Sequence, residues 1–274
     1  IFTDRNKAEF SSWYSFFPRS AARIEGKHGT FQDVINLLPR VKELGFDVVY
    51  LPPIHPIGTT FRKGKNNATD CKPGEPGVPY GIGSPEGGHT AIHSELGTLK
   101  DFKKLVKACQ DMDLEIALDL AIQCSPDHPW VKEHPDWFKI LPDGTIKYAE
   151  NPPKKYQDIY PVNFETEDWQ NLWQELKNVI FTWAEWGVKI IRVDNPHTKA
   201  FGFWEWVIAE TREVYPEMIF LSEAFTKPKV MQQLAKVGFT QSYTYFAWRN
   251  SKYELESYMN ELTKTEMRHY FRPN

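Results

Sequence analysis

Two short apolar runs, each the length of a β-strand, end in a carboxylate, and the carboxyl ends of strands commonly carry catalytic residues. The run that begins at Gly187 holds Arg192 and ends at Asp194, and the run that begins at Met218 ends at Glu223. Alternate residues of a strand point to one face, so we expect the Arg192 and Asp194 side chains to lie side by side. A carboxylate pair at neighbouring strand ends predicts acid/base or nucleophilic chemistry.

Each of these residues has a distinct expected role. Asp194 is the candidate nucleophile, and the charge of Arg192 would keep its carboxylate ionised and aimed. Glu223 is the candidate general acid/base, which requires a raised pKa. Retaining glycosidase chemistry needs two carboxyl groups about 5–5.5 Å apart, a spacing that adjacent parallel strands provide. Taken singly, an aspartate at a strand end can instead cap a helix, and a loop glutamate can be ordinary solvated surface.

Further polar residues allow two interpretations. Asp119 closes a third apolar run, where it either supports the site or contacts substrate. The polar residues of the long loops are either ordinary surface or, if they converge, an anion pocket for a phosphate. No nucleotide-binding P-loop is present, so such a phosphate would belong to a sugar. These loop residues are Lys63, Asn67, Asn151, Lys154 and Tyr156.

Composition excludes several classes of partner. The chain has 274 residues, 41% of them hydrophobic, with a formal net charge of −3 and a pI near 6.3. It therefore offers no basic field for nucleic acid, and no apolar run approaches the ~20 residues of a membrane span. The three cysteines lack metal-site spacing and are interpreted as reduced cytosolic thiols. We expect neither a metal nor a cofactor.

The elements that must position these residues alternate along the chain. Short apolar strands are followed by loops and amphipathic helices, the pattern of a parallel sheet covered by helices. The predicted strands are 12–17, 47–51, 115–121, 189–193, 218–222 and 241–246. The predicted helices are 31–44, 99–112, 167–186, 204–215, 227–237 and 252–265. The expected fold class is α/β, a (β/α)8 TIM barrel of which about six units are present, with a seventh strand starting near 269–274.

Two long segments interrupt this rhythm, and both follow strands. Residues 54–97 are rich in glycine and proline, and residues 122–166 carry several prolines. Loops of this length are usually functional or form a small subdomain, and in a barrel they belong to the face that carries active sites. The predicted organisation is a first part of the barrel over 1–121, a loop-rich insertion over 122–166 and an incomplete continuation over 167–274.

At this point the chain resembles a known superfamily. Asp119, the Arg192–Asp194 pair and Glu223 resemble the successive motifs of the α-amylase superfamily of retaining α-glucan enzymes, in that family's order. The chain departs from hydrolytic amylases at Gln123–Cys124 and at 195–199, and its unusual strings look like the branch of α-1,4-glucan:maltose-1-phosphate maltosyltransferases. Those strings are residues 13–20, 61–67, 123–130 and 151–156.

The resemblance implies a function. Such enzymes move maltosyl from α-maltose 1-phosphate to the non-reducing end of an α-1,4-glucan, release phosphate with net retention and act in the cytoplasm. It also implies Asp194 as nucleophile, Glu223 as acid/base and Arg192 as orienting cation. A homodimer of the full-length protein is a further expectation. The positions that match the family's donor site are Lys63, Asn67, Gln123, Asn151, Lys154, Tyr156, Asp158 and Asn195.

Three alternatives stay open. An α-amylase-type hydrolase would use the same carboxylates without dependence on phosphate. A non-catalytic α-glucan-binding barrel and an unrelated barrel enzyme with a carboxylate pair are the others. The family's third carboxylate, an Asp after strand seven, has no counterpart in these 274 residues. We therefore expect these residues alone to be inactive.

Overall fold

A computed structural model describes residues 3–274 of the chain. The first two residues of the predicted 1–121 segment lie outside the described residues. The strands are β1 (Trp13–Ser15), β2 (Val48–Leu51), β3 (Glu115–Leu120), β4 (Gln123–Cys124), β5 (Ala149–Asn151), β6 (Lys154–Tyr156), β7 (Tyr160–Pro161), β8 (Ile190–Asp194), β9 (Ile219–Glu223) and β10 (Gln241–Ser242). The helices are α1 (Asn6–Glu9), α2 (Phe31–Glu43), α3 (Leu99–Asp111), α4 (Pro129–Glu133), α5 (Trp169–Glu185), α6 (Phe201–Val214), α7 (Pro228–Lys236) and α8 (Lys252–Lys264).

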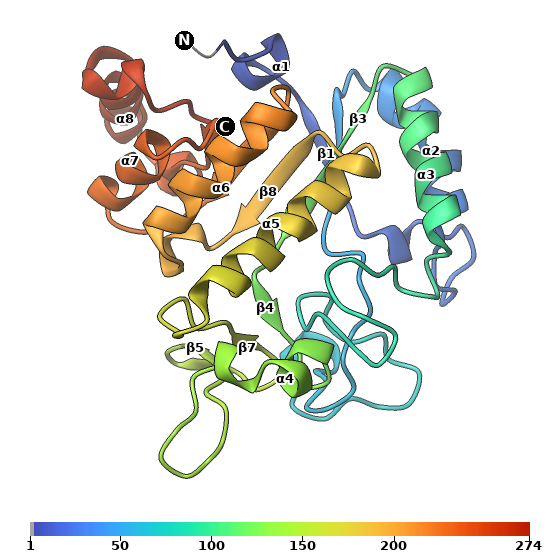
Figure 1. Cartoon of the computed structure of the whole chain (residues 1–274). Coiled ribbons are helices and arrows are strands. Elements are labelled where there is room, and N and C mark those ends of the chain that lie inside the picture. The colour runs from blue at the N-terminus through green and yellow to red at the C-terminus, as the bar shows by residue number, and fades with distance from the viewer. Residues whose placement is uncertain (1–2) are drawn as a thin grey trace.

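Six strands form a curled parallel sheet in the order β1-β2-β3-β8-β9-β10 within the described residues. Helices α2, α3, α5 and α6 lie around its outer side, and α7 and α8 follow near the C-terminus (Figure 1). This arrangement is part of a barrel wall and confirms the predicted α/β class with alternating strands and helices.

The two faces of the sheet have different partners. The main core packs the outward side chains of the strands against the helices, and includes Leu51, Leu118, Ile191 and Trp183. A smaller cluster lies on the inner face and includes Val48, Ala117, Ile190 and Ile219, with Ala8 of α1 packed against it. Because side chains alternate along a strand, Tyr50, Asp119 and Arg192, each two positions after a member of this cluster, point to the same inner face, as does Glu223, four positions after Ile219.

Local signals in the sequence explain where helices begin and end. Thr30, Thr98 and Ser251 each accept a hydrogen bond from the third residue of the following helix in a complete capping box. Each such cap is worth about 1 kcal/mol. Gly187, between α5 and β8, has a φ of +98°, and a Cβ there would lie 2.7 Å from Val106. A glycine is therefore required for the chain to turn into β8.

The sixth strand is shorter than predicted. We predicted a strand over 241–246, but β10 ends at Ser242 and residues 245–248 form a 3-10 helix begun by the Thr244 side chain. The other five strand predictions and all six helix predictions fall on observed elements, with ends that differ by up to three residues. Near the C-terminus, Ser242 pairs in parallel with Pro273, close to where a seventh strand was predicted.

The two long segments lie at the carboxyl end of the sheet, at the lower side of Figure 1. They contain short elements that the sequence did not predict, including the β4–β7 and β5–β6 pairs. The segments contact each other: the backbone N–H groups of Thr59 and Thr60 donate to Asp127 Oδ2 at 2.6 and 2.8 Å. One loop therefore supports the other.

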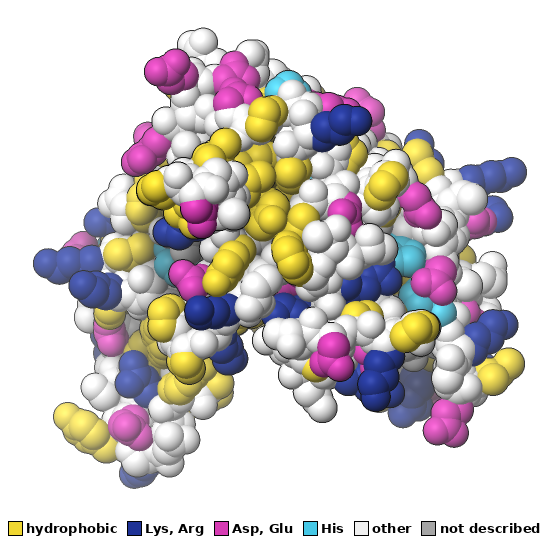
Figure 2. Space-filling view, turned by 90° about the horizontal axis from the view of Figure 1, so that it is seen from below, with side chains coloured by type: hydrophobic (Ala, Val, Ile, Leu, Met, Phe, Trp, Pro, Cys, Tyr) yellow, Lys and Arg dark blue, Asp and Glu magenta, His cyan; other side chains and the backbone are white. Residues whose placement is uncertain are grey.

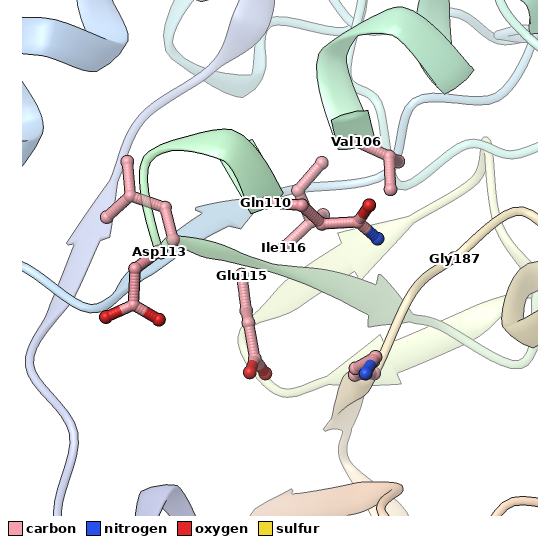
Figure 3. A pocket seen from close by; sticks show the side chains of 8 residues that line it. Val106, Gln110, Asp113, Glu115, Ile116 and Gly187 are labelled. Carbon is pink, nitrogen blue, oxygen red and sulfur yellow. The ribbon is translucent and has the colours of Figure 1, made fainter. Parts of the chain in front are cut away.

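The opposite end of the sheet holds a small cavity of about 160 Å³. Its lining includes Gln110, Asp113 and Glu115, at and before the start of β3 (Figure 3). Glu115 accepts a 2.7 Å hydrogen bond from Arg5, so this end is held together by an ion pair. In the part of the chain from residue 3 onward, no helix is long and apolar enough to cross a membrane.

Candidate functional site

The register of the central strands brings the predicted catalytic residues together. Asp119 of β3 is the partner of Arg192 of β8, and Asp194 of β8 is the partner of Glu223 of β9. Adjacent strands lie about 4.8 Å apart, so paired positions place their side chains in reach of one another. The four residues form what we call the carboxylate cluster.

Arg192 is the centre of the carboxylate cluster. Its Nη1 lies 3.0 Å from both Asp119 oxygens and 2.9 Å from Asp194 Oδ1, and its Nη2 lies 3.5 Å from Glu223 Oε2. The side chain is 9% exposed, and burial by itself lowers its pKa. The negative charges of Asp119 and Asp194 outweigh burial and raise the pKa, so the guanidinium stays charged.

Asp119 is fully buried and satisfied by protein groups. Besides Arg192, the hydroxyls of Tyr50 and Tyr80 donate to its Oδ2 at 2.5 and 2.7 Å. Burial raises the pKa of Asp119 to about 6, while Arg192 acts against that rise. These contacts leave no exposed surface for a ligand and favour the structural interpretation, in which Asp119 positions Arg192.

Asp194 and Glu223 are the members that solvent reaches, with side chains 14% and 15% exposed. Burial raises the pKa of Glu223, and the negative charge of Asp194 adds to the rise against Arg192. Asn195 contacts both: its backbone N–H donates to Glu223 and its Nδ2 to Asp194, each at 3.3 Å. Asn195 has a φ of +45°, a conformation that asparagine tolerates better than most residues. The cluster thus holds two accessible carboxylates side by side, and the pKa of one of them, Glu223, is raised above its usual value.

Two other predicted residues are buried near each other. Lys63 is 2% exposed and Asp158 is 4% exposed. Lys63 donates to Gln157 Oε1, whereas Asp158 Oδ1 is buried without a hydrogen-bond partner. Burial raises the pKa of Asp158, and Lys63 acts against that rise. A buried lysine beside an unsatisfied carboxylate oxygen provides polar atoms that a ligand can use.

The remaining predicted residues are spread along the loops. Gln123 connects to the carboxylate cluster indirectly, because its Nε2 donates to the backbone oxygen of Tyr80 at 3.1 Å. Asn151 and Lys154 face each other as exposed partners in the β5–β6 pair, and half-buried Tyr156 closes it. Asn67 is exposed and has a φ of +64°. None of the hydrogen bonds and ion pairs described for residues 3–274 joins Asn67, Asn151, Lys154 or Tyr156 to the cluster.

Sequence reasoning missed several residues around the cluster. Tyr50 stands two positions from Val48 on the inner face, so strand alternation alone could have identified it. Tyr80 lies in a loop and carried no such signal. Lys199 was noticed only as part of a string, yet burial lowers its pKa to about 8 while Asp194 and Glu223 act in the opposite direction.

An aromatic group beyond Glu223 was also missed, and we call it the aromatic platform. Phe225 contacts Trp248 edge-on with ring centroids 4.8 Å apart and Tyr245 at 5.6 Å. Trp248 is 55% exposed and Phe225 is 37% exposed. Within residues 3–274 these rings therefore offer apolar surface on which a sugar could stack.

Figure 2 shows the face at the carboxyl end of the sheet. It is hollowed between two parts of the molecule, and Lys and Arg side chains border the hollow. The hollow lies on the side of the molecule where the carboxylate cluster and the two long segments are found. A ligand that carries negative charge would meet cations on approach.

Known proteins match this chain along most of its length. The family model described as alpha amylase, catalytic domain, matches residues 2–215. Proteins named alpha-1,4-glucan:maltose-1-phosphate maltosyltransferase are 62% identical over 271 residues in Chlorobaculum tepidum and 60% identical over 274 residues in Methylacidiphilum infernorum. The match to the Chlorobaculum tepidum protein includes 99% of this chain and 40% of that protein. The match to the Methylacidiphilum infernorum protein includes 100% of this chain and 41% of that protein. The chain thus spans about two fifths of the curated relatives it matches.

A solved structure supports the same grouping. The crystal structure of an α-amylase from Lactobacillus plantarum superposes with a TM-score of 0.75 at 25% identity, covering 95% of this chain and 61% of that protein. The family model matches well over half of the residues, and the structure places the carboxylate cluster at the carboxyl end of a parallel sheet. The chain therefore belongs to the α-amylase catalytic-domain family.

Proposed function

We propose that the full-length protein, meaning the natural polypeptide that contains residues 1–274, is a retaining maltosyltransferase. It moves maltosyl from α-maltose 1-phosphate to the non-reducing end of an α-1,4-glucan and releases phosphate. The observation that carries this proposal is the direct pairing of Asp194 with Glu223 beside Arg192. Relatives named for this activity, 53–62% identical, provide the substrate class.

In the first half-reaction, an Asp194 oxygen attacks the anomeric carbon while the bond to the phosphate oxygen breaks. Its electron pair leaves with the phosphate, and the proton comes from Glu223 or is already carried by the donor. The raised pKa of Glu223 suits it to hold that proton. Arg192 donates to Asp194 Oδ1 at 2.9 Å, and the other oxygen, Oδ2, which accepts only the longer bond of 3.3 Å from Asn195 Nδ2, is the one that attacks.

In the second half-reaction, Glu223 acts as a base. It removes the proton of the acceptor 4-hydroxyl, which attacks the anomeric carbon and releases Asp194. Transfer prevails over hydrolysis when the acceptor sugar is held in place of water, because a positioned hydroxyl has a high effective molarity. The aromatic platform lies next to Glu223 in the chain and offers stacking surface for the acceptor glucan.

The donor would lie between the two long segments. Lys63, Gln123 and Asp158 are buried or half-buried and carry polar side-chain atoms in this region. Asn195 is exposed, and its Nδ2 donates to Asp194. Four further residues are assigned to the donor site by the resemblance alone, because their side chains make no described contact with the cluster. They are Asn67, Asn151, Lys154 and Tyr156. A phosphate is doubly charged near neutral pH, so lysines would lower the cost of holding it near Asp194.

The wider organisation follows the same proposal. The curled sheet would be six strands of a (β/α)8 barrel, with residues 122–166 as an insertion subdomain. The full-length protein would act in the cytoplasm as a homodimer, without nucleic acid. Residues 1–274 alone would be inactive, because they lack the carboxylate that the family carries after its seventh strand.

The proposal is tested by phosphate release from α-maltose 1-phosphate with and without a maltooligosaccharide. Full-length protein should release phosphate in an acceptor-dependent manner and lengthen the glucan. The isolated 274-residue chain serves as the comparison and should show no turnover. Starch cleavage by folded full-length protein, with no phosphate released, would assign a hydrolase instead.

A further inference from the structure

Lys199 is an ammonium group beside the carboxylate cluster that no proposed step uses. It follows the 3-10 helix Pro196–Thr198, which leads directly out of β8 past Asp194. Its side chain is half-buried, and its Nζ donates to Asn195 O at 3.3 Å and to Thr198 Oγ1 at 2.9 Å. A third N–H of the ammonium is not engaged by these two bonds.

The contacts of Lys199 differ from those of a structural lysine. In the described residues it forms no ion pair within 4.0 Å, although it lies within the electrostatic reach of Asp194 and Glu223. Asn195, which holds it, also contacts both carboxylates. The ammonium is therefore held at a fixed place near the reacting groups, at the cost of partial desolvation and without a paired anion.

The Lys199 ammonium offsets negative charge in the carboxylate cluster. Asp119 and Asp194 are balanced by Arg192 and Lys199 when Glu223 carries its proton. Without Lys199, the site would be negative before a phosphate arrived, and a dianion would be repelled. Lysine acts as a compact point charge, which suits a phosphate whose oxygens share the charge.

We propose that the Lys199 ammonium binds the phosphate of the donor as it departs, and that it thereby selects a sugar phosphate over other maltosyl donors. The inference rests on the proposed function and adds a leaving-group site to it. The Asp194–carbon bond forms as the carbon–oxygen bond breaks, and the electron pair goes to the phosphate oxygen. Glu223 or the donor itself supplies the proton, and Lys199 keeps its own.

Two donors with different leaving groups test this role in full-length protein. Transfer to a maltooligosaccharide is measured from α-maltose 1-phosphate and from α-maltosyl fluoride, whose leaving group is monatomic. Lys199→Met should lower kcat/KM for the phosphate donor by about 100-fold or more, as loss of a charged transition-state contact does. Its kcat/KM for the fluoride donor should stay within about threefold of wild type. Lys199→Arg should recover much of the phosphate-donor activity.

The controls separate a leaving-group role from a structural one. Lys229→Met removes an exposed lysine of α7 and should alter neither donor. Inorganic phosphate should inhibit fluoride-dependent transfer by wild type and do so far more weakly in Lys199→Met and Lys199→Gln. Equal losses with both donors would assign Lys199 to loop structure or acceptor binding, and no loss with either would also overturn the inference. Wild-type protein that uses the fluoride but not the phosphate would instead refute the proposed function.

Discussion

Asp194 and Glu223 are direct partners in the register between β8 and β9, and Arg192 contacts both carboxylates. The pairing places the nucleophile and acid/base candidates at the same level of the sheet. Arg192 lies two positions before Asp194 on the same strand face, so one guanidinium reaches both neighbouring strands.

Asp194→Asn should abolish transfer. An amide is not an effective nucleophile toward the anomeric carbon, and Asp119, the other aspartate of the carboxylate cluster, is fully buried. We expect kcat/KM for α-maltose 1-phosphate to fall by about 10,000-fold or more. Thermal unfolding checks that the variant is folded, and activity within tenfold of wild type would contradict the assignment.

Glu223→Ala should slow the acceptor step more than donor cleavage. A donor phosphate can carry its own proton because its second pKa is near 6, whereas the acceptor hydroxyl needs a base. Mass spectrometry of the variant mixed with α-maltose 1-phosphate should therefore detect protein with one added maltosyl group. If both steps slow equally and no adduct forms, Glu223 is not the base for the acceptor.

Arg192 substitutions should separate charge from geometry. Lys has one charge but cannot span Asp119, Asp194 and Glu223 as a guanidinium does. Arg192→Lys should lower kcat/KM by about 100-fold, comparable to other lost charge-orienting contacts. Arg192→Met should also lower the free energy of unfolding by about 3–5 kcal/mol, since it leaves Asp119 buried and unpaired.

The Arg192 experiment has an internal check. Burial raises the pKa of Asp119 to about 6 even though Arg192 acts against the rise, so Asp119 in Arg192→Met should take up a proton at a higher pH than in the wild-type protein. The stability deficit of Arg192→Met should therefore shrink on acidification from pH 7 to pH 5. A deficit that is independent of pH would place the cost in packing instead of charge.

Acidification should destabilise the wild-type protein through three buried histidines. Burial lowers the pKa of His55 to about 3, of His89 to about 4 and of His128 to about 2. The unfolded chain takes up these protons below about pH 6.5, but the folded chain does not, so stability falls as the pH drops below that value. Asp119 opposes this trend, because between about pH 6 and 4 the folded chain binds a proton at Asp119 that the unfolded chain does not. Urea unfolding at a series of pH values measures the slope.

His55→Phe tests the origin of that slope. His55 stacks on Trp183 with ring centroids 5.1 Å apart, so a phenylalanine keeps the stacking and removes the titration. The slope between pH 6 and 5 should decrease by up to about 1.4 kcal/mol per pH unit, the value for one proton. His269→Gln, at an exposed position, is the matched control. An unchanged slope in His55→Phe would locate the effect elsewhere.

Trp248→Ala should weaken acceptor binding without affecting the donor. The ring is exposed and contacts Phe225, next to the acid/base candidate, so its loss removes stacking surface from the acceptor side. We expect KM for a maltooligosaccharide to rise about 10-fold, in line with the loss of an aromatic contact. KM for α-maltose 1-phosphate should not change, and Tyr253→Ala, at another exposed ring, should alter neither value. A rise in both KM values after Trp248→Ala would point to a general structural effect.

The sequence by itself determined the strand–helix alternation and the strand positions of the candidate residues Arg192, Asp194 and Glu223. Arg192 and Asp194 share a face because side chains alternate along any strand, and Asp194 and Glu223 stand at strand ends because apolar runs stop there. The starts of helices α2 and α3 could also be predicted from local sequence, because a capping box needs only two residues that lie three positions apart. The strand predicted over 241–246 begins at Gln241 but ends at Ser242, because Thr244 begins a 3-10 turn that competes with extension.

Only the tertiary structure decided which distant groups meet. The partnership of Asp119 with Arg192, and of Asp194 with Glu223, is a matter of register between strands far apart in the chain. Tyr80, Lys199 and Trp248 reach the site from loops or turns, whose course depends on long-range packing and not on local periodicity. Burial, which raises the pKa of Glu223 and lowers that of Lys199, likewise exists only once these segments enclose the cluster.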